Sequence, residues 1–242
     1  MRLLPFALSL ALATPLAAQE MTDAARDAFR AEVRAYLLEN PEVLMEAIGV
    51  LEAREQEQAA AADFELARAN ADALFNDPTS FVGGNPDGDI TIVEFMDYRC
   101  GFCKRAYPEV AELISRDGNI RYIVKEFPIL GEESVLASRF ALAAKLVAGD
   151  DVYDEVHSTL MQYQGNISQA ALQRVGDSFG LDTDAIFAAM TSDEVTSIIN
   201  ANRALAERMR ISGTPTFVVD DQMLRGYVPL DQMQQIVAAV RG

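Results

Sequence analysis

The 242-residue chain contains two cysteines, Cys100 and Cys103, in the stretch RCGFCK. Two residues separate them, so on a helix they would lie about one turn apart. Unpaired backbone N–H groups and the helix dipole favour a thiolate at the start of a helix. We therefore expect Cys100 to act as a nucleophile, and Cys103 to attack the mixed disulfide that Cys100 forms with a substrate. Phe102, between them, adds no positive charge that would stabilise the thiolate further.

Two structural roles for the same pair are disfavoured. A structural zinc ion takes four ligands, and the chain has one histidine, His157, so a zinc site would need a second subunit. A disulfide that closes so short a loop adds little stability. His157 itself lies in a helical pattern, which indicates a surface or packing residue rather than a ligand.

The residues around the pair predict the elements that position it. The β-branched apolar run Ile90–Met96 predicts a strand buried on both faces, shortly before Cys100. A helical pattern follows from Cys100, and Ile120–Phe127 predicts a second strand. Strand, helix and strand in this order form a βαβ unit. A CxxC pair that follows a buried strand within such a unit is a specific signal for redox chemistry.

The C-terminal part predicts a second set of sheet elements. Thr216–Val219 reads as a strand, Asp220-Asp221 as a hairpin turn and Met223–Tyr227 as the partner strand, followed by a closing helix over Leu230–Val240. Residues from about 132 to 209 show only helical patterns. The N-caps expected there are Ser168, Asp182 and Ser192. The sequence therefore predicts an α/β fold whose two halves are separated by a helical insertion.

The segment before this domain is expected to be helical. Residues 22–39 and 41–75 are rich in Ala, Glu, Arg and Gln, and Asn40-Pro41 predicts a helix start between them. Apolar residues spaced by three and four form a narrow stripe, which packs either on the domain or on a second chain. They are Phe29, Val33, Tyr36, Leu44, Ile48 and Leu51. A homo-oligomer through residues 22–75 is thus one of two expectations.

Composition sets the remaining boundaries. The stretch Asp77–Asp89, dense in Gly, Pro, Asn and Asp, predicts a loop that separates an extension of residues 19–76 from a main domain of residues 77–242. Residues 1–18 have the layout of a signal peptide cleaved after Ala18, which predicts a periplasmic protein. The formal net charge of −17 argues against nucleic acid or an anionic membrane surface as a partner.

Three stretches in combination resemble the DsbA-like branch of the thioredoxin superfamily. They are VEFMDYRCGFCK (Val93–Lys104), KEFPIL (Lys125–Leu130) and SGTPTFVV (Ser212–Val219). The resemblance covers residues from about 78 to 242 and implies a thioredoxin fold with an inserted helical domain. The N-terminal helices are also similar to the oligomerising extensions of periplasmic disulfide isomerases and ScsC-like proteins.

The resemblance implies a substrate-binding surface beside the cysteines. Pro215 lies where the family carries a cis-proline that faces the pair, and Thr214 before it would present its backbone to a substrate peptide. Phe102 would belong to the same surface. Gly101-Phe102 stands in place of the Pro-His dipeptide of the strong oxidases, so the direction of the reaction stays open.

Glu94 lies where family members have a buried acid beneath the second cysteine. The resemblance implies that it exchanges a proton with Cys103. The alternative is an acid at a strand end that pairs with a cation such as Lys125.

Together these patterns predict a periplasmic thiol–disulfide oxidoreductase, an oxidase or an isomerase, which acts on exported proteins through Cys100 and Cys103. No cofactor and no metal is expected. The expected partners are cysteine-containing client proteins and a membrane redox partner protein. The alternative is a thiol-based binding protein, either a chaperone or a copper-tolerance carrier that holds Cu(I) between the two thiolates.

Overall fold

The computed structural model describes residues 21–242, so the predicted signal peptide of residues 1–18 lies outside the described residues. The chain divides into two compact units, one that ends at Glu55 and one from Gln56 to Gly242. Within residues 21–242, every helix falls short of the length and apolar character that a membrane crossing would require.

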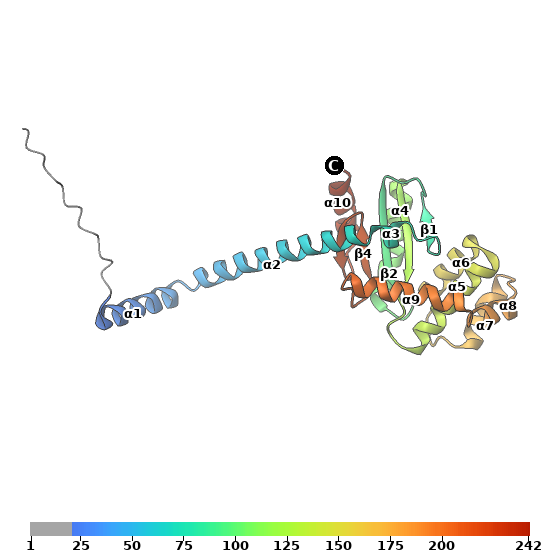
Figure 1. Ribbon diagram of the computed structural model, residues 1–242, viewed down its shortest axis with the longest axis horizontal. Coiled ribbons are helices and arrows are strands. Elements are labelled where there is room, and N and C mark those ends of the chain that lie inside the picture. The colour runs from blue at the N-terminus through green and yellow to red at the C-terminus, as the bar shows by residue number, and fades with distance from the viewer. Residues whose placement is uncertain (1–20) are drawn as a thin grey trace, which may run out of the picture. The chain divides into compact units, whose positions relative to one another are not determined.

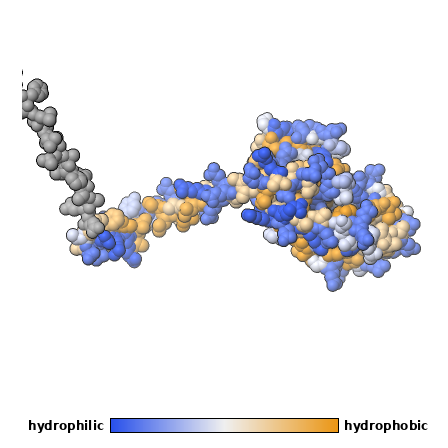
Figure 2. Space-filling view, viewed as in Figure 1, coloured by the Kyte–Doolittle hydropathy of each residue, from blue (hydrophilic) through white to orange (hydrophobic). Residues whose placement is uncertain are grey.

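The first unit is helical, as its composition predicts. Helix α1 spans Asp23–Glu39, and helix α2 spans Glu42–Ala69 and continues into the second unit. The side chain of Thr22 caps α1 by accepting a hydrogen bond from the backbone N–H of Ala25. All six residues of the predicted apolar stripe are exposed in the single chain, and Figure 2 shows apolar side chains along both helices.

The predicted helix over residues 41–75 is wrong in one respect, because it is interrupted. A short helix α3, Ala71–Phe75, follows α2 after a break at Asn70. Asn70 has φ −114° and ψ 15°, outside helical values, and its side-chain amide donates to the carbonyl of Leu66 at 2.9 Å. An asparagine that bonds its own preceding turn in this way ends a helix readily.

The second unit is built on a five-stranded sheet with the order β1-β3-β2-β4-β5. The strands are β1 Phe81–Gly84, β2 Ile90–Met96, β3 Ile120–Glu126, β4 Thr216–Val219 and β5 Gln222–Arg225. Strands β2 and β3 are parallel, and the other neighbours are antiparallel. The predicted βαβ unit and C-terminal hairpin are therefore confirmed.

Strand β1 corrects the sequence prediction, which assigned a loop to the whole of Asp77–Asp89. Its four residues include two glycines, so it has little strand propensity of its own. Pairing with β3 defines it, with Phe81 opposite Val124. At Gly84, where φ is +66°, an added Cβ would collide with the carbonyl oxygen of Ile120, so only glycine fits there.

Helices cover the sheet and form the insertion (Figure 1). Helices α4 and α10 pack together on the sheet. The helices after β1 are α4 Gly101–Asp117, α5 Glu132–Ala148, α6 Asp150–Gln162, α7 Gln169–Ser178, α8 Thr183–Ala189, α9 Asp193–Arg208 and α10 Leu230–Arg241. The insertion between β3 and β4 is thus helical as predicted, and Ser168, Asp182 and Ser192 are confirmed as N-caps of α7, α8 and α9.

The central strand β2 contributes to two separate cores. Ile92 and Met96 pack in the larger core, which includes residues of α4, α10 and the insertion. Val93 and Phe95 pack in the smaller core, with residues of α3 and α9. Successive side chains of a strand point to opposite faces, so Glu94, between Val93 and Phe95, points to the face of Ile92, Met96 and helix α4.

A buried ion pair ties the segment before β1 to the sheet. The ammonium group of Lys125, on β3, is fully buried and donates to Asp77 at 2.6 Å and to the carbonyl of Ala73 at 2.8 Å. Burial raises the pKa of Asp77, but hydrogen bonds from Lys125 and Thr79 outweigh it and lower the pKa to about 2. Removing the carboxylate would therefore leave a buried cation without its counter-ion.

We expect Asp77→Ala to lower the free energy of unfolding by about 3 kcal/mol, the cost of leaving a buried charge unpaired. Urea denaturation at neutral pH measures it. The matched control is Asp150→Ala, which removes an aspartate that pairs with Lys145 at 2.9 Å but is 59% exposed. That change should cost less than about 1 kcal/mol. Equal losses in the two variants would contradict the role assigned to the Lys125 pair.

Candidate active site

Cys100 is the N-cap residue of helix α4. Its backbone is extended, with φ −75° and ψ 114°, and its sulfur accepts a hydrogen bond from the backbone N–H of Cys103 at 3.2 Å. Ser, Thr, Asn and Asp side chains usually fill this position with an oxygen atom. Here the capping acceptor is a sulfur, so the predicted location of Cys100 at a helix start is confirmed.

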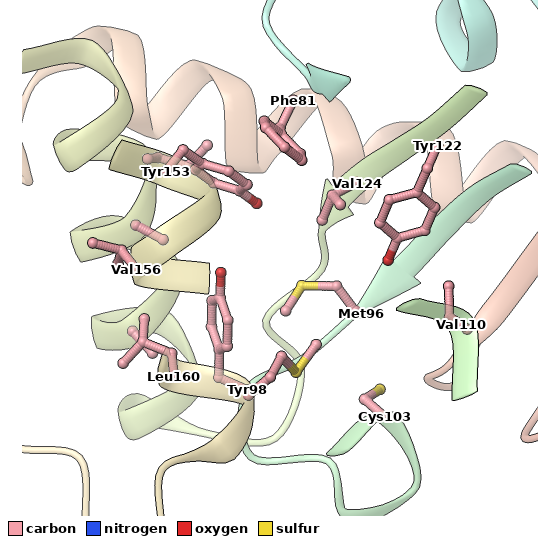
Figure 3. Close-up of a cluster of buried hydrophobic side chains, with 14 of the residues drawn as sticks. Phe81, Met96, Tyr98, Cys103, Val110, Tyr122, Val124, Tyr153, Val156 and Leu160 are labelled. Carbon is pink, nitrogen blue, oxygen red and sulfur yellow. The ribbon is translucent and has the colours of Figure 1, made fainter. Parts of the chain in front are cut away.

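The two cysteines differ in exposure, and both are free thiols. Cys100 is 5% exposed to solvent, whereas Cys103 is fully buried. Cys103 lies in the larger core with Met96, Tyr98 and Val110 (Figure 3). Phe102, between them, is 60% exposed. Cys100 is therefore the more accessible of the two cysteines, as a nucleophile requires.

The loop before β4 lies against the sulfur of Cys100. The Thr214-Pro215 peptide bond is cis, which confirms the expectation from the family resemblance. In its protonated form, the thiol of Cys100 donates to the carbonyl oxygen of Thr214 at 3.1 Å. The tertiary fold thus brings residues more than 110 positions apart in the chain, Cys100 and Thr214, into direct contact.

The proton affinities of the two sulfurs are strongly unequal. The side-chain hydrogen bond from Cys103 is the main cause that lowers the pKa of Cys100, and the value reaches about 6 although burial opposes it. Burial raises the pKa of Cys103 far above that of an ordinary thiol, and its hydrogen bond to Cys100 raises it further. At neutral pH the Cys100 sulfur is therefore mostly ionised, and the Cys103 sulfur is protonated.

Glu94 is buried on the same side of the sheet as Cys103. The hydroxyl of Tyr122, on β3, donates a hydrogen bond to Oε2 of Glu94, and Oε1 has no hydrogen-bond partner among the described residues. Burial raises the pKa of Glu94 to about 8. The carboxylate in turn raises the pKa of Cys103. Glu94 therefore titrates near neutral pH and acts electrostatically on the buried cysteine.

The alternative pairing of Glu94 with Lys125 is wrong. Lys125 lies opposite Phe95 in the register of β2 and β3, so its side chain points to the other face of the sheet. There it pairs with Asp77. Successive side chains of a strand point to opposite faces, so Glu94 and Lys125 lie on opposite sides of the sheet although both are buried.

Asp97 is a site residue that the sequence reasoning missed. Its carboxylate accepts backbone hydrogen bonds from Arg99 at 2.7 Å, Ile129 at 2.8 Å and Leu130 at 3.1 Å. It therefore fastens the loop after β3 to the turn that precedes Cys100. The hydrogen bond from the Arg99 N–H to the Asp97 side chain forms an Asx turn. The position of Asp97 between a predicted strand and a predicted helix is the sequence signal that could have indicated this turn.

A second buried acid, Glu126, joins the sheet to the insertion. It accepts hydrogen bonds from the hydroxyls of Tyr98 and Tyr153, each at 2.7 Å, and of Ser138 at 2.6 Å. His157 contacts this cluster through Nδ1, 3.0 Å from the Tyr98 hydroxyl. Of the two positions considered for His157, a buried packing residue is correct and a surface residue is not, because it is 1% exposed.

The arrangement as a whole suits thiol–disulfide exchange. The more accessible sulfur has a lowered pKa, the buried sulfur one helical turn away has a raised pKa, and a carboxyl that titrates near neutrality acts on the second. Within residues 21–242, no three His, Cys, Asp or Glu side chains are grouped so that they could hold a metal ion.

Comparison with known families agrees with this geometry. The DSBA-like thioredoxin domain matches residues 91–238, more than half of the chain. The N-terminal domain of the copper resistance protein ScsC matches residues 26–58. The chain belongs to the DSBA-like thioredoxin domain family, and the predicted thioredoxin fold with a helical insertion is confirmed.

Individual relatives cover different parts of the chain. A thioredoxin-like oxidoreductase from Silicibacter pomeroyi DSS-3 is 42% identical, with a TM-score of 0.66 over 70% of this chain and 96% of that one. ScsC of Proteus mirabilis in a transitional conformation is 29% identical, with a TM-score of 0.67 over 91% of this chain and 99% of that one. The Na⁺/H⁺ antiporter NhaA 3 of Salinispora tropica is 28% identical over 156 residues, 64% of this chain. The match spans about a quarter of the length of such curated relatives.

We expect Cys103→Ala to raise the pKa of Cys100 from about 6 toward that of an ordinary thiol, because the largest stabilising hydrogen bond is lost. The ultraviolet absorbance of the thiolate, followed against pH, measures it directly, since Cys100 is then the sole cysteine. Cys103→Ser is the matched control, because its hydroxyl can still donate and should keep the pKa low. Equal pKa values in the two variants would refute this cause.

Glu94 predicts a pH dependence of stability. Its folded-state pKa of about 8 exceeds its ordinary value of 4.5, so its contribution is complete below about pH 4.5 and is lost as pH rises through 8. The free energy of unfolding of the reduced protein should therefore fall less steeply between pH 5 and 9 in Glu94→Gln than in the wild type. The exposed acid Glu112, changed to Gln, serves as the control and should leave the slope unchanged. Identical slopes in wild type and Glu94→Gln would contradict the assignment.

Proposed function

We propose that this protein is a periplasmic thiol–disulfide oxidoreductase that forms or rearranges disulfides in exported proteins. The proposal rests on the unequal pair of cysteines at the start of α4: Cys100 is 5% exposed and has a pKa lowered to about 6, whereas Cys103 is fully buried and has a raised pKa. Membership of the DSBA-like thioredoxin domain family supports the same reaction class. Residues 77–242 are the proposed catalytic domain.

In the reductive direction, the Cys100 thiolate attacks one sulfur of a client disulfide. A mixed disulfide forms, the client S–S bond breaks, and the first client thiolate leaves. Glu94 then accepts the proton of Cys103, whose sulfur attacks Cys100 and releases the second client thiolate. The client gains two electrons and the Cys100/Cys103 pair becomes a disulfide. The same steps in reverse oxidise a client dithiol.

The client would bind beside the pair. The Thr214 backbone lies against the reactive sulfur, and the exposed ring of Phe102 offers apolar surface next to it. An extended client peptide would pair with the backbone at Thr214 and Pro215. A membrane redox partner protein would restore the pair after each cycle, to the disulfide in an oxidase and to the dithiol in an isomerase.

Residues 22–75 are the proposed oligomerisation segment. The six stripe residues of α1 and α2 are all exposed in the single chain, and the ScsC N-terminal domain matches residues 26–58. Burial of this stripe in a second copy would remove it from water. An oligomer would favour isomerase activity, because several clefts could then hold one misfolded client.

Exchange with a model dithiol tests the reaction. Wild-type protein should turn over, and Cys100→Ser should fall to the uncatalysed rate. Cys103→Ser, given a model disulfide in place of the dithiol, should stop at the mixed disulfide, which mass spectrometry detects as a covalent adduct. Full turnover by Cys100→Ser would exclude the redox function. The reduction potential of the pair, together with its redox state in the cell envelope, then separates an oxidase from an isomerase.

Light scattering of the full mature chain tests the oligomer. Ile48→Glu combined with Leu51→Glu should reduce an oligomeric mass to that of a monomer, because it places two charges within the apolar stripe. The matched control is Glu46→Ala, since Glu46 lies on the opposite side of α2 from Leu44 and Ile48. A monomeric wild-type protein would remove the preference for an isomerase.

A copper-tolerance carrier is the second candidate, favoured by the match of residues 26–58 to a copper resistance protein. Two thiolates would hold Cu(I). The buried and strongly protonated Cys103 argues against it, since the metal would have to displace that proton. The exchange assay separates the two candidates, because a carrier would not turn over a dithiol.

A further inference from the structure

The insertion loop, defined as residues 163–167 between α6 and α7, is anchored in the core at both ends and exposed in its middle. Ile167 is 3% exposed, and Tyr163 packs against the same larger core. Gln164, Gly165 and Asn166 between them are exposed. Gly165 has φ +112°, a backbone conformation that other residues rarely adopt, so a glycine here lets the chain turn between its two anchors.

Both residues that flank the cysteine pair hold this loop. Arg99, directly before the pair, donates from Nη1 to the carbonyl oxygen of Gly165 at 2.8 Å. Lys104, directly after the pair, donates from its ammonium group to the carbonyl oxygen of Tyr163. Hydrogen bonds from charged donors are stronger than neutral ones. The insertion loop is therefore fastened to the start of α4, on which the redox chemistry depends.

Glu133 of α5 completes the attachment. Its Oε2 accepts the backbone N–H of Ile167 at 3.0 Å and lies 3.2 Å from Nε of Arg99. The charge of Arg99 is thus paired with a carboxylate, and that of Lys104 is directed to a carbonyl oxygen. Two cations beside the cysteines would by themselves favour acidic clients. Here they hold the loop instead, and the loop presents uncharged residues to the solvent.

The side chains of Gln164 and Asn166 suit a polypeptide backbone as their partner. An amide group has two donors and an acceptor, so it can bind the C=O and N–H groups of a peptide whatever its sequence. On the fold's other contact with the site, the carbonyl oxygen of Thr214 lies 3.1 Å from the Cys100 sulfur. A client segment joined to that sulfur would thus meet both the Thr214 backbone and the insertion loop.

We propose that the insertion loop is a second contact site for the client, which binds the client backbone through Gln164 and Asn166 while a client cysteine is joined to Cys100. The proposal rests on the function proposed above and names its client class, which is unfolded segments recognised by their backbone. Arg99 and Lys104 are positioning residues, because they act through the loop.

Photocrosslinking of a trapped client tests the proposal. In the full mature protein with Cys103→Ser, a photoreactive benzoylphenylalanine replaces Gln164. A peptide with one cysteine is supplied as its disulfide with thionitrobenzoate. The Cys100 thiolate attacks the peptide sulfur, the mixed disulfide forms, and coloured thionitrobenzoate leaves. On illumination we expect a crosslink between the insertion loop and the peptide. Two peptides of unrelated sequence should crosslink equally.

The matched control carries the photoreactive residue at Asp184. This residue is exposed on α8, which packs on α5 and α7 and lies at the end of the insertion away from α4 (Figure 1). We expect no crosslink from it. Arg99→Gln removes the charged donor to Gly165, so most of the crosslink from position 164 should be lost. Arg174→Gln, at an exposed arginine of α7, makes the same change in charge and should leave the yield unaltered.

The two proposals fail in different ways. Without release of thionitrobenzoate, the redox function is refuted and the client site with it. If the mixed disulfide forms but position 164 gives no crosslink, or no more than position 184, only the client site is overturned. A crosslink to one of the two peptides alone, or equal yields in Arg99→Gln and Arg174→Gln, would also overturn it.

Discussion

The hydrogen bond from the Cys103 N–H to the Cys100 sulfur is the interaction on which the site depends. It makes one atom both the cap of α4 and the candidate nucleophile. The effect is reciprocal, because the free energy by which the helix start lowers the pKa of Cys100 equals that by which the thiolate stabilises the helix start. Helix formation and sulfur ionisation therefore favour each other. The side-chain hydrogen bond from Cys103 lowers the pKa of Cys100 most, and the backbone N–H adds to it, so that burial of the thiol is overcome.

The alternation of β2 decides how the rest of the site is supported. Glu94 and Met96 face α4, so the carboxyl of Glu94 lies in the larger core, where burial raises its pKa to about 8. Tyr122 reaches it because Ile92 and Tyr122 are register partners, which places Tyr122 on the same face. Lys125 has the opposite parity and pairs with Asp77, so Lys125 and Glu94 lie on opposite faces of the sheet. One strand thus separates the face that carries Glu94 from the face that anchors the segment before β1.

Buried polar contacts also hold the insertion in place. Glu126 at the end of β3 accepts three hydroxyl hydrogen bonds, two of them from residues of the insertion, Ser138 and Tyr153. Asn202 of α9 donates to the carbonyl of the same Glu126 at 3.1 Å. Since buried polar groups are costly unless every one is satisfied, these contacts favour one docking of the insertion over others. The loop that Asp97 fastens, next to Cys100, begins where this strand ends.

Local signals were enough to predict the elements and the reactive pair. Each of these signals depends on residues a few positions apart, so the sequence shows it without the fold. They are the β-branched run before Cys100, the caps at Ser168, Asp182 and Ser192, and the turn at Asp220. Three features could be seen only in the folded chain, because each joins residues more than 20 positions apart. They are strand β1, the hydrogen-bond partner of Glu94, and the contact of Thr214 with Cys100. The family resemblance indicated a buried acid, but the choice of Tyr122 over Lys125 follows from strand register, which a single sequence does not display. Burial, and with it the raised pKa values of Glu94 and Cys103, was likewise decided by tertiary packing, since the same thiol or carboxyl titrates normally when water surrounds it.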